Sequence, residues 1–206
     1  MEHLKISFTN PEPDVIVRAV QVLRQGGCIV YPTDTCYGLG CDARSVRAMK
    51  RITQLKGREE AKKFSVIARD IDHIISLTIV DRLQQSILEQ YLPGPYTFIL
   101  LNADFSVAQT STLGVRIPDC PVTQAIADEF SEAYITTSAN LGGTGALYSF
   151  EEIQSSLLAG TRASLQPDLI LDAGPLVRSP SSTVVDLTKS EPVIIRQGAG
   201  AFRGLR

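Results

Sequence analysis

The sequence contains no tryptophan, only two histidines and four cysteines, none of them spaced as C-x-x-C, among its 206 residues. A zinc site needs about four clustered nitrogen or sulfur ligands, and His3 and His73 do not supply them. We therefore expect no metal site built from histidine or cysteine. The cysteines are interpreted as reduced thiols, with Cys28 in a strand, and nothing marks Cys36 as a nucleophile.

Long apolar runs are also missing. No uninterrupted run approaches the roughly 20 residues of a membrane span, and the N-terminus MEHLKISFTNPEPD has no apolar signal core. We therefore expect a cytoplasmic protein with no membrane partner. The formal net charge of −2 gives the whole chain no electrostatic attraction for nucleic acid, although a local basic patch stays open.

Helical and strand patterns alternate along the chain, which predicts one α/β domain over residues 1–206 without a linker. Apolar residues at helical spacing predict helices at 13–25, 45–56, 70–77, 80–91, 122–130 and 150–160. Ser149 and Glu152 are spaced as a capping box for the last of these. Short apolar runs predict strands at 28–31, 64–68, 96–101, 114–117, 133–138, 169–174, 182–187 and 192–198.

The last two of these strands suit an antiparallel hairpin, because a short polar turn joins them. The fold class is therefore a mixed parallel and antiparallel sheet with helices packed on it. The tail AFRGLR is expected to be loose.

Polar stretches follow several predicted strands, where open α/β sheets bind ligands. The stretches are PTDT at 32–35, KGR at 56–58, STLGVRIP at 111–118, TTSAN at 136–140, SSTVVD at 181–186 and IIRQG at 194–198. The thirteen-residue segment YPTDTCYGLGCDA, which begins with a strand residue, reads as a ligand-holding loop rich in hydroxyls and glycines.

Four cations lie in these stretches: Lys56, Arg58, Arg116 and Arg196. The two arginines of the later stretches lie within apolar strands, where an unpaired guanidinium is costly to bury. An ion pair with Asp172 or Asp186 would explain any one arginine. For the four cations together, the natural partner is a polyphosphate, since Arg binds it in a bidentate way and Lys as a point charge.

Hydroxyls accompany the cations at Thr33, Thr35, Ser138 and Ser182, although each alone is typical of a cap or a turn. The turn GGTG at 142–145 is weak support for phosphate binding, and no Walker A pattern is present. No histidine lies near a candidate nucleophile, which argues against a Ser-His-Asp hydrolase. The set favours a site for a nucleotide and a small amphoteric substrate, with magnesium assisting catalysis.

The ordered motifs YPTDTCYGLGCDA, KGR, PGPYTFIL, VRIPDCP, TTSAN, STVVDL and IRQG resemble the YrdC/Sua5/YciO family from about residue 14 to about residue 200. The resemblance implies a twisted, mixed YrdC/RibB-like sheet with a large concave surface. Its characterised members are threonylcarbamoyl-AMP synthases. They convert L-threonine, bicarbonate and ATP with Mg²⁺ into threonylcarbamoyl-adenylate and pyrophosphate, which implies a nucleotidyltransferase that feeds the t6A transferase machinery acting on tRNA position 37.

The resemblance also implies two sets of contacts. The residues expected to bind ATP are Lys56, Arg58, Arg116, Asn140 and Arg196. The residues expected to bind threonine are Thr33, Thr112, Ser138 and Ser182, with Thr35 and Tyr37 as further candidates.

The family's K-x-R and S-x-N signatures match Lys56 with Arg58, and Ser138 with Asn140. The segment after K-x-R departs from the synthase pattern. Many members have a proline before the next strand, whereas this chain has Lys62 and Lys63, and that stretch resembles the YciO branch. We favour the synthase; the alternative is a YciO-like paralogue that binds nucleotide, double-stranded RNA or tRNA. A local basic run suits RNA, although a solvated helix face is the favoured explanation of the run. The run comprises Lys50, Arg51, Lys56, Arg58, Lys62 and Lys63.

Overall fold

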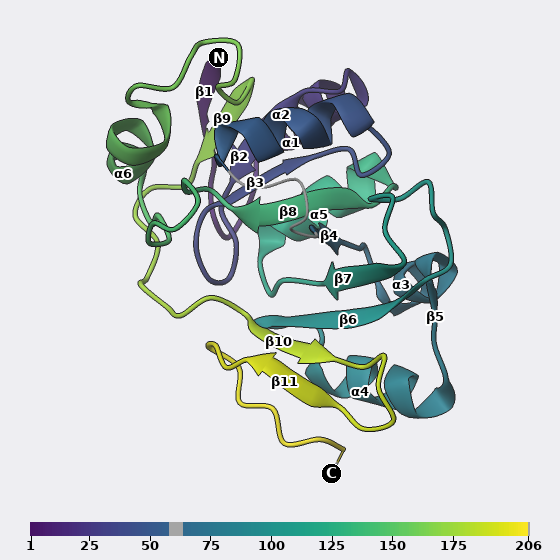
Figure 1. Cartoon of the computed structure of the whole chain (residues 1–206). Helices are drawn as coiled ribbons and strands as arrows, with labels where there is room; N and C mark the ends of the chain where they lie inside the picture. The colour runs from purple at the N-terminus through teal and green to yellow at the C-terminus, as the bar shows by residue number, and fades with distance from the viewer. Residues whose placement is uncertain (58–63, 206) are drawn as a thin grey trace.

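One mixed sheet runs through the computed structural model, which describes residues 1–57 and 64–205 (Figure 1). The strand order is β1-β9-β2-β3-β8-β4-β7-β6-β10-β11, and β5 pairs with β6 beside this path. The predicted single-domain mixed sheet with packed helices is thus confirmed. Arg58, Lys62 and Lys63 lie outside the described residues.

The strands are β1 Glu2–Lys5, β2 Cys28–Tyr31, β3 Gly38–Cys41, β4 Ser65–Ile67, β5 Thr78–Ile79, β6 Tyr96–Asn102, β7 Thr112–Arg116, β8 Tyr134–Ser138, β9 Leu169–Asp172, β10 Thr183–Asp186 and β11 Val193–Arg196. The helices are α1 Pro13–Arg24, α2 Val46–Leu55, α3 Ile71–Leu77, α4 Arg82–Tyr91, α5 Pro121–Phe130, α6 Phe150–Glu152 and the π-helical η1 Ile153–Leu158. The predicted strands and the predicted helices up to residue 130 are present, and β10 and β11 form the predicted hairpin, whereas β1, β3 and β5 were not predicted.

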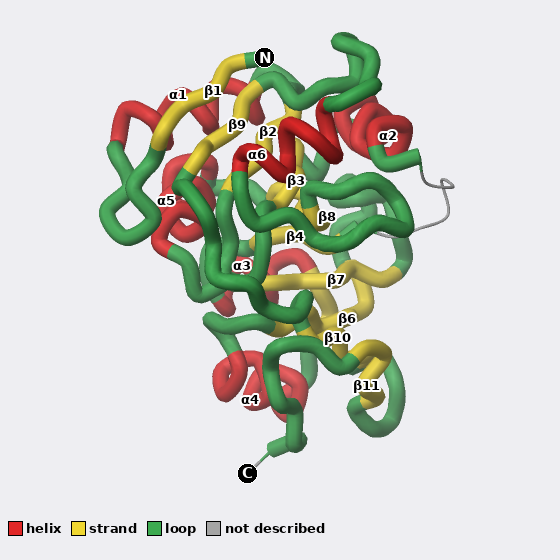
Figure 2. Tube along the Cα trace, turned by 90° about the vertical axis from the view of Figure 1, so that its left-hand side faces the viewer, coloured by secondary structure: helices red, strands yellow, loops and turns green. Residues whose placement is uncertain are grey.

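Helices cover the two halves of the sheet differently. In the half of the sheet that contains β2, helices α1 and α5 pack on Ile29 and Tyr31 of that strand, and α2 packs with Val30 on the other side (Figure 2). In the other half, α3 and α4 pack behind β6 and β7, burying Phe98 and Val115 (Figure 1). Among the described residues, no helix lies in front of β6, β7 and β10 in that view.

Three local predictions need correction. Residues 150–160 do not form one α-helix, because α6 gives way to the π-helical η1. Ser149 Oγ accepts from the Glu152 N–H at 3.3 Å, but the Glu152 carboxylate accepts from the Tyr148 N–H at 2.7 Å and so caps a different residue. The described tail is not loose, because Phe202 packs against Tyr91 and the Tyr91 hydroxyl donates to Gly204 O at 2.7 Å.

The segment read as one loop at 31–43 is a hairpin. Its second half is β3, which pairs antiparallel with β2 through Cys28↔Cys41 and Tyr31↔Gly38. The glycines make room for the Tyr31 ring: a Cβ on Gly40 would lie 3.0 Å from that ring and 2.3 Å from Ile135 O. Only residues 32–37 form the connecting loop. β3 lacks the usual alternation of apolar and polar residues that predicts a strand, because glycines occupy two of its four positions.

Among the described residues, no helix is long and apolar enough to cross a membrane.

Replacing Gly40 by alanine is expected to destabilise the protein by about 1–3 kcal/mol, because overpacking against a backbone oxygen forces a shift of the strand. Gly145→Ala is the matched control, since a Cβ there meets nothing within 4 Å. Urea unfolding followed by circular dichroism measures both variants. Equal midpoints for the two variants would contradict this account of β3.

Candidate functional site

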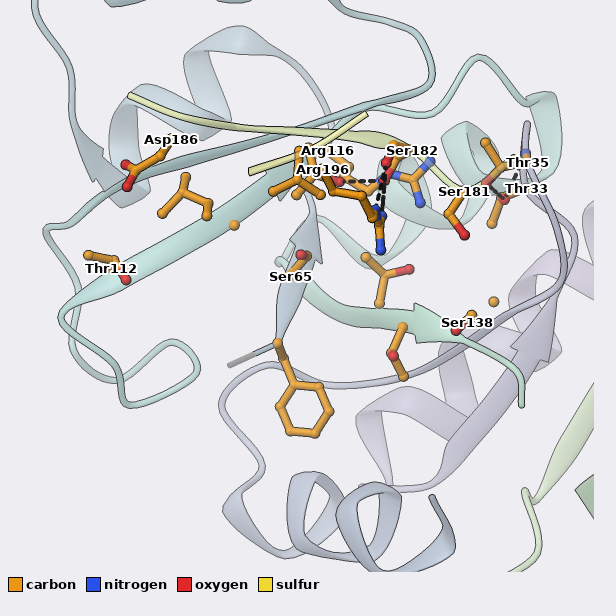
Figure 3. Close-up of a pocket in the computed structure, with 18 of the residues that line it drawn as sticks. Thr33, Thr35, Ser65, Thr112, Arg116, Ser138, Ser181, Ser182, Asp186 and Arg196 are labelled. Atoms are coloured by element: carbon orange, nitrogen blue, oxygen red, sulfur yellow. Dashed lines mark hydrogen bonds between the residues drawn. The ribbon is translucent and has the colours of Figure 1, made fainter. Parts of the chain in front are cut away.

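A cavity of about 500 Å³ lies between the 32–37 loop and the strands β8, β4, β7, β6, β10 and β11. Figure 3 shows Arg116 and Arg196 close together beside Ser182, with Thr33 toward one end and Thr112 toward the other. The lining is rich in hydroxyls, and it brings together seven of the residues predicted from sequence. These are Thr33, Thr35, Thr112, Arg116, Ser138, Ser182 and Arg196.

Strand alternation delivers many of these side chains. On β7, Thr112, Gly114 and Arg116 line the cavity, whereas Leu113 and Val115 are fully buried in the core. This is the two-residue period of a strand, which sends successive side chains to opposite faces. An arginine in an apolar strand is therefore explained here by its position on the cavity face.

A β-bulge brings Arg196 to the cavity. Val185 of β10 pairs with Ile194, whereas the preceding residue, Val184, pairs with Arg196. Ile195 is therefore the extra residue of β11. The Arg196 guanidinium donates to Ser182 O at 2.8 Å and to Ser182 Oγ at 3.2 Å. Burial and the neighbouring charge of Arg116 lower the pKa of Arg196.

Arg116 is ion-paired with Asp34, not with Asp172 or Asp186 as the sequence allowed. The Arg116 Nη2–Asp34 Oδ1 distance is 2.8 Å, and the two side chains are 10% and 8% exposed. Asp172 instead pairs with His3 and Lys5, and Asp186 accepts from its neighbour Thr188. Asp34 lies between the two threonines of the loop, so the ion pair joins that loop to the end of β7.

The threonines of the loop make a compact turn. The Thr33 hydroxyl donates to Cys36 O at 2.7 Å and accepts from the Thr35 and Cys36 N–H groups at 3.2 and 3.3 Å. Thr33 and Thr35 are only 3% and 2% exposed, yet both border the cavity. Burial raises the pKa of the Cys36 thiol, which also lines the cavity, so this thiol is neutral at pH 7.

The signature residues Lys56 and Asn140 lie away from the cavity lining and bind each other. Lys56 is 1% exposed, and its ammonium donates to Asn140 O at 2.7 Å, to Asn140 Oδ1 at 3.3 Å and to Ser138 O. Asn140 Nδ2 in turn donates to Thr144 O at 2.6 Å. In this structure the two residues hold the backbone after β8, beside the Ser138 side chain that does line the cavity.

Tyr37 and the glycine-rich turn 142–145 also lie outside the described lining. The Tyr37 hydroxyl donates to Gly174 O at 2.8 Å and accepts from the Ala173 N–H at 3.0 Å, which fixes the turn after β9. Burial raises the pKa of this phenol, which stays protonated. These contacts indicate that Tyr37 stabilises the turn after β9.

Several lining residues were not singled out by the sequence analysis, although Thr136, Ser181 and Asp186 lie within its stretches TTSAN and SSTVVD. The residues not singled out are Ser65, Thr97, Thr136, Ser181, Asp186 and Lys189. Some could have been found from strand alternation: Thr136 is two residues from Ser138, and Asp186 is four residues from Ser182. No comparable signal exists for Ser65, which reaches the site because β4 pairs in parallel with β7 and places it opposite Gly114.

A family model for the Sua5/YciO/YrdC domain, described as "Telomere recombination", matches residues 21–198. The chain belongs to the Sua5/YciO/YrdC family. The family resemblance drawn from the motifs is confirmed.

The named relatives in this family fall into two groups. The uncharacterized protein YciO of Escherichia coli K12 is 34% identical over 197 residues, which cover 93% of this chain and 92% of that protein. The threonylcarbamoyl-AMP synthases of Mus musculus and Homo sapiens are 36% and 35% identical over 82% of this chain. The matched segment covers 61% and 62% of those two longer proteins.

Solved structures of the family share the fold. The crystal structure of E. coli YciO matches with a TM-score of 0.85 and 33% identity over 98% of both chains. The structure of P. abyssi Sua5 complexed with L-threonine matches with a TM-score of 0.86 at 24% identity, over 96% of this chain and 58% of that one.

Replacing Lys56 by methionine is expected to destabilise the protein by about 3 kcal/mol, because each buried carbonyl left without a donor costs about 1–3 kcal/mol. Lys50→Met is the control, since Lys50 is exposed on α2, the helix that ends at Leu55 with Lys56 as its C-cap. Chemical denaturation measures both. If Lys56→Met were as stable as the control, the assignment of Lys56 to the fold would be wrong.

Proposed function

We propose that the protein is a threonylcarbamoyl-AMP synthase, which makes threonylcarbamoyl-adenylate and pyrophosphate from L-threonine, bicarbonate and ATP. The observation that carries this proposal is the cavity in which a hydroxyl-lined loop faces Arg116 and Arg196. Hydroxyls suit a small amino acid, and paired guanidiniums suit phosphate oxygens. Relatives named as this synthase support the same reaction.

The proposed reaction needs placement more than a protein nucleophile. The threonine amine bonds to the carbon of bicarbonate and water leaves, which gives a carbamate. A carbamate oxygen then bonds to the α-phosphorus of ATP, while the bond from that phosphorus to the oxygen bridging to the β-phosphate breaks and pyrophosphate leaves. Thr33, Ser138 and Ser182 are proposed to bind the amino acid, and Arg116 and Arg196 the phosphates. The arginines then stabilise the charge that develops on pyrophosphate. Arg58, a further expected phosphate contact, lies outside the described residues.

Magnesium would enter with ATP. Asp34 is engaged by Arg116, and Asp186 Oδ1 accepts two bonds from Thr188. Within the described residues, no group of three His, Cys, Asp or Glu side chains can hold a metal ion. This fits Mg²⁺, which is commonly bound through substrate phosphates with few protein ligands. When bound, the ion would neutralise charge on the leaving pyrophosphate.

A YciO-like paralogue with a different reaction is the second candidate. It is favoured by the match to YciO over 93% of this chain and 92% of that protein, and by the inward position of Lys56 and Asn140. RNA binding has less support, because Arg51 is paired with Asp168 and Lys56 is buried. Of the described members of the basic run, that leaves Lys50 as the one exposed cation.

If the protein is the synthase, the t6A transferase machinery is the proposed consumer of the adenylate.

Pyrophosphate release is expected only when ATP, Mg²⁺, L-threonine and bicarbonate are all present, because the carbamate must form before the α-phosphate is attacked. The assay omits each component in turn, and mass spectrometry identifies the adenylate. A protein that binds ATP but releases no threonine-dependent pyrophosphate would support the paralogue instead.

L-Threonine should be preferred to L-serine by about 10- to 200-fold in kcat/KM, since one methyl group in a pocket is worth about 1–3 kcal/mol. Valine should be worse than serine, because it leaves the hydroxyl partners in the pocket unpaired. Steady-state pyrophosphate release with each amino acid measures this order. Equal turnover of the three amino acids would exclude the hydroxyl-lined pocket as the amino-acid site.

A further inference from the structure

The carboxylate of Asp34 is held from two directions. Its Oδ1 accepts from Arg116 Nη2 at 2.8 Å, and its Oδ2 accepts from the Asp119 backbone N–H at 3.2 Å. Its side chain is 8% exposed. The carboxylate is therefore fixed by the segment that follows β7, and it fixes the guanidinium at the end of the same strand.

Protein acceptors satisfy only part of the Arg116 side chain. Its Nε is buried without a hydrogen-bond partner, and the bond to Asp34 is its only hydrogen bond within residues 1–57 and 64–205. The planar guanidinium is thus anchored at one nitrogen, while the residue borders the cavity. A group held in this way has donors left for a ligand and one fixed orientation.

Arg116 and Arg196 also carry like charges into one cavity. The charge of Arg116 disfavours the charged form of Arg196. The protein acceptors of Arg196 on Ser182 are uncharged. Asp34 is the one carboxylate in the described part of the chain that is hydrogen-bonded to either guanidinium. It therefore offsets half of the positive charge that the two arginines bring.

We infer that Asp34 is a positioning residue of the proposed reaction: it orients Arg116 toward the bound anion and limits the positive charge of the cavity. The inference rests on the proposed function for its kinetic part only. Orientation and charge predict opposite effects when Asp34 is neutralised. Losing the orientation slows the chemical step, whereas losing the negative charge strengthens anion binding.

Asp34→Asn keeps the size of the side chain and removes its charge. We expect kcat to fall about tenfold, while the Kd of ATP and of inorganic pyrophosphate falls about threefold. A purely structural residue would weaken binding and turnover together. Asp34→Glu, which retains the charge, should restore the wild-type Kd.

Asp119→Asn is the matched control. It also removes one negative charge, but the Asp119 side chain is exposed and only its backbone N–H contacts Asp34. Its kcat and its Kd values for ATP and pyrophosphate should stay within about twofold of wild type, as is usual for surface substitutions. Arg116→Gln should raise the Kd of pyrophosphate. In the double variant Asp34→Asn/Arg116→Gln, the gain in affinity seen for Asp34→Asn should be lost, because the two residues act as a pair.

Calorimetry with ATP and with pyrophosphate alone measures binding without turnover, and thermal unfolding checks that each variant folds. If wild type releases no threonine-dependent pyrophosphate but Asp34→Asn still tightens pyrophosphate binding through Arg116, the proposed reaction fails and the role of Asp34 in anion binding stands. Unchanged or weaker pyrophosphate binding in folded Asp34→Asn, additive effects in the double variant, or no pyrophosphate binding by wild type would each overturn the inference.

Discussion

Two guanidinium groups of like charge face one cavity, and the surrounding structure is arranged to hold them there. Arg116 comes from a central strand and is paired with a buried carboxylate, whereas Arg196 comes from the edge strand β11 and rests on the oxygens of Ser182. Burying such groups without partners would be costly. The 32–37 loop supplies the carboxylate that pairs with Arg116, and the β10–β11 bulge places Arg196 beside the oxygens of Ser182.

Some residues of the K-x-R and S-x-N signatures stabilise the fold, and others line the cavity. Lys56 and Asn140 are buried side by side and hold the chain where it leaves β8. Ser138, two residues before Asn140, presents its side chain to the cavity. A buried ammonium that donates to backbone carbonyls makes this segment rigid, because breaking the contact would leave both the charge and the carbonyls unsatisfied. Rigidity at this point keeps the Ser138 side chain in place.

The sequence predicts the helices and strands better than the contacts that their residues make across the fold. Amphipathic α1 and α2 and the apolar β6 follow from local periodicity, which depends on neighbours in the chain. β3 was missed because Gly38 and Gly40 do not read as strand residues, and they are explained by the Tyr31 ring and, at Gly40, by the Ile135 carbonyl that lie against them. The partner of Arg116 was missed for a similar reason: Asp34 lies 82 positions away, and only the sheet order brings the two together.

The same comparison separates the reliable part of the site prediction from the rest. Residue types at strand ends indicated the cavity residues Thr33, Ser182 and Arg196, because strand alternation and sheet edges are regular features. They did not indicate that Lys56 is buried, since a lysine at a helix end is equally suited to solvent, to phosphate or to carbonyl oxygens. The choice depends on which acceptors another strand supplies.

Local rules are broken where the cavity is built. An arginine occupies an apolar strand, glycines occupy β3, and an extra residue interrupts the pairing of β11. Each is locally unfavourable, and natural sequences tend to accept such conflicts at functional sites. The three features share one effect, since they set the 32–37 loop, Arg116 and Arg196 around the same space. That convergence argues for a ligand with both an anionic part and a small polar part, whichever reaction the protein performs on it.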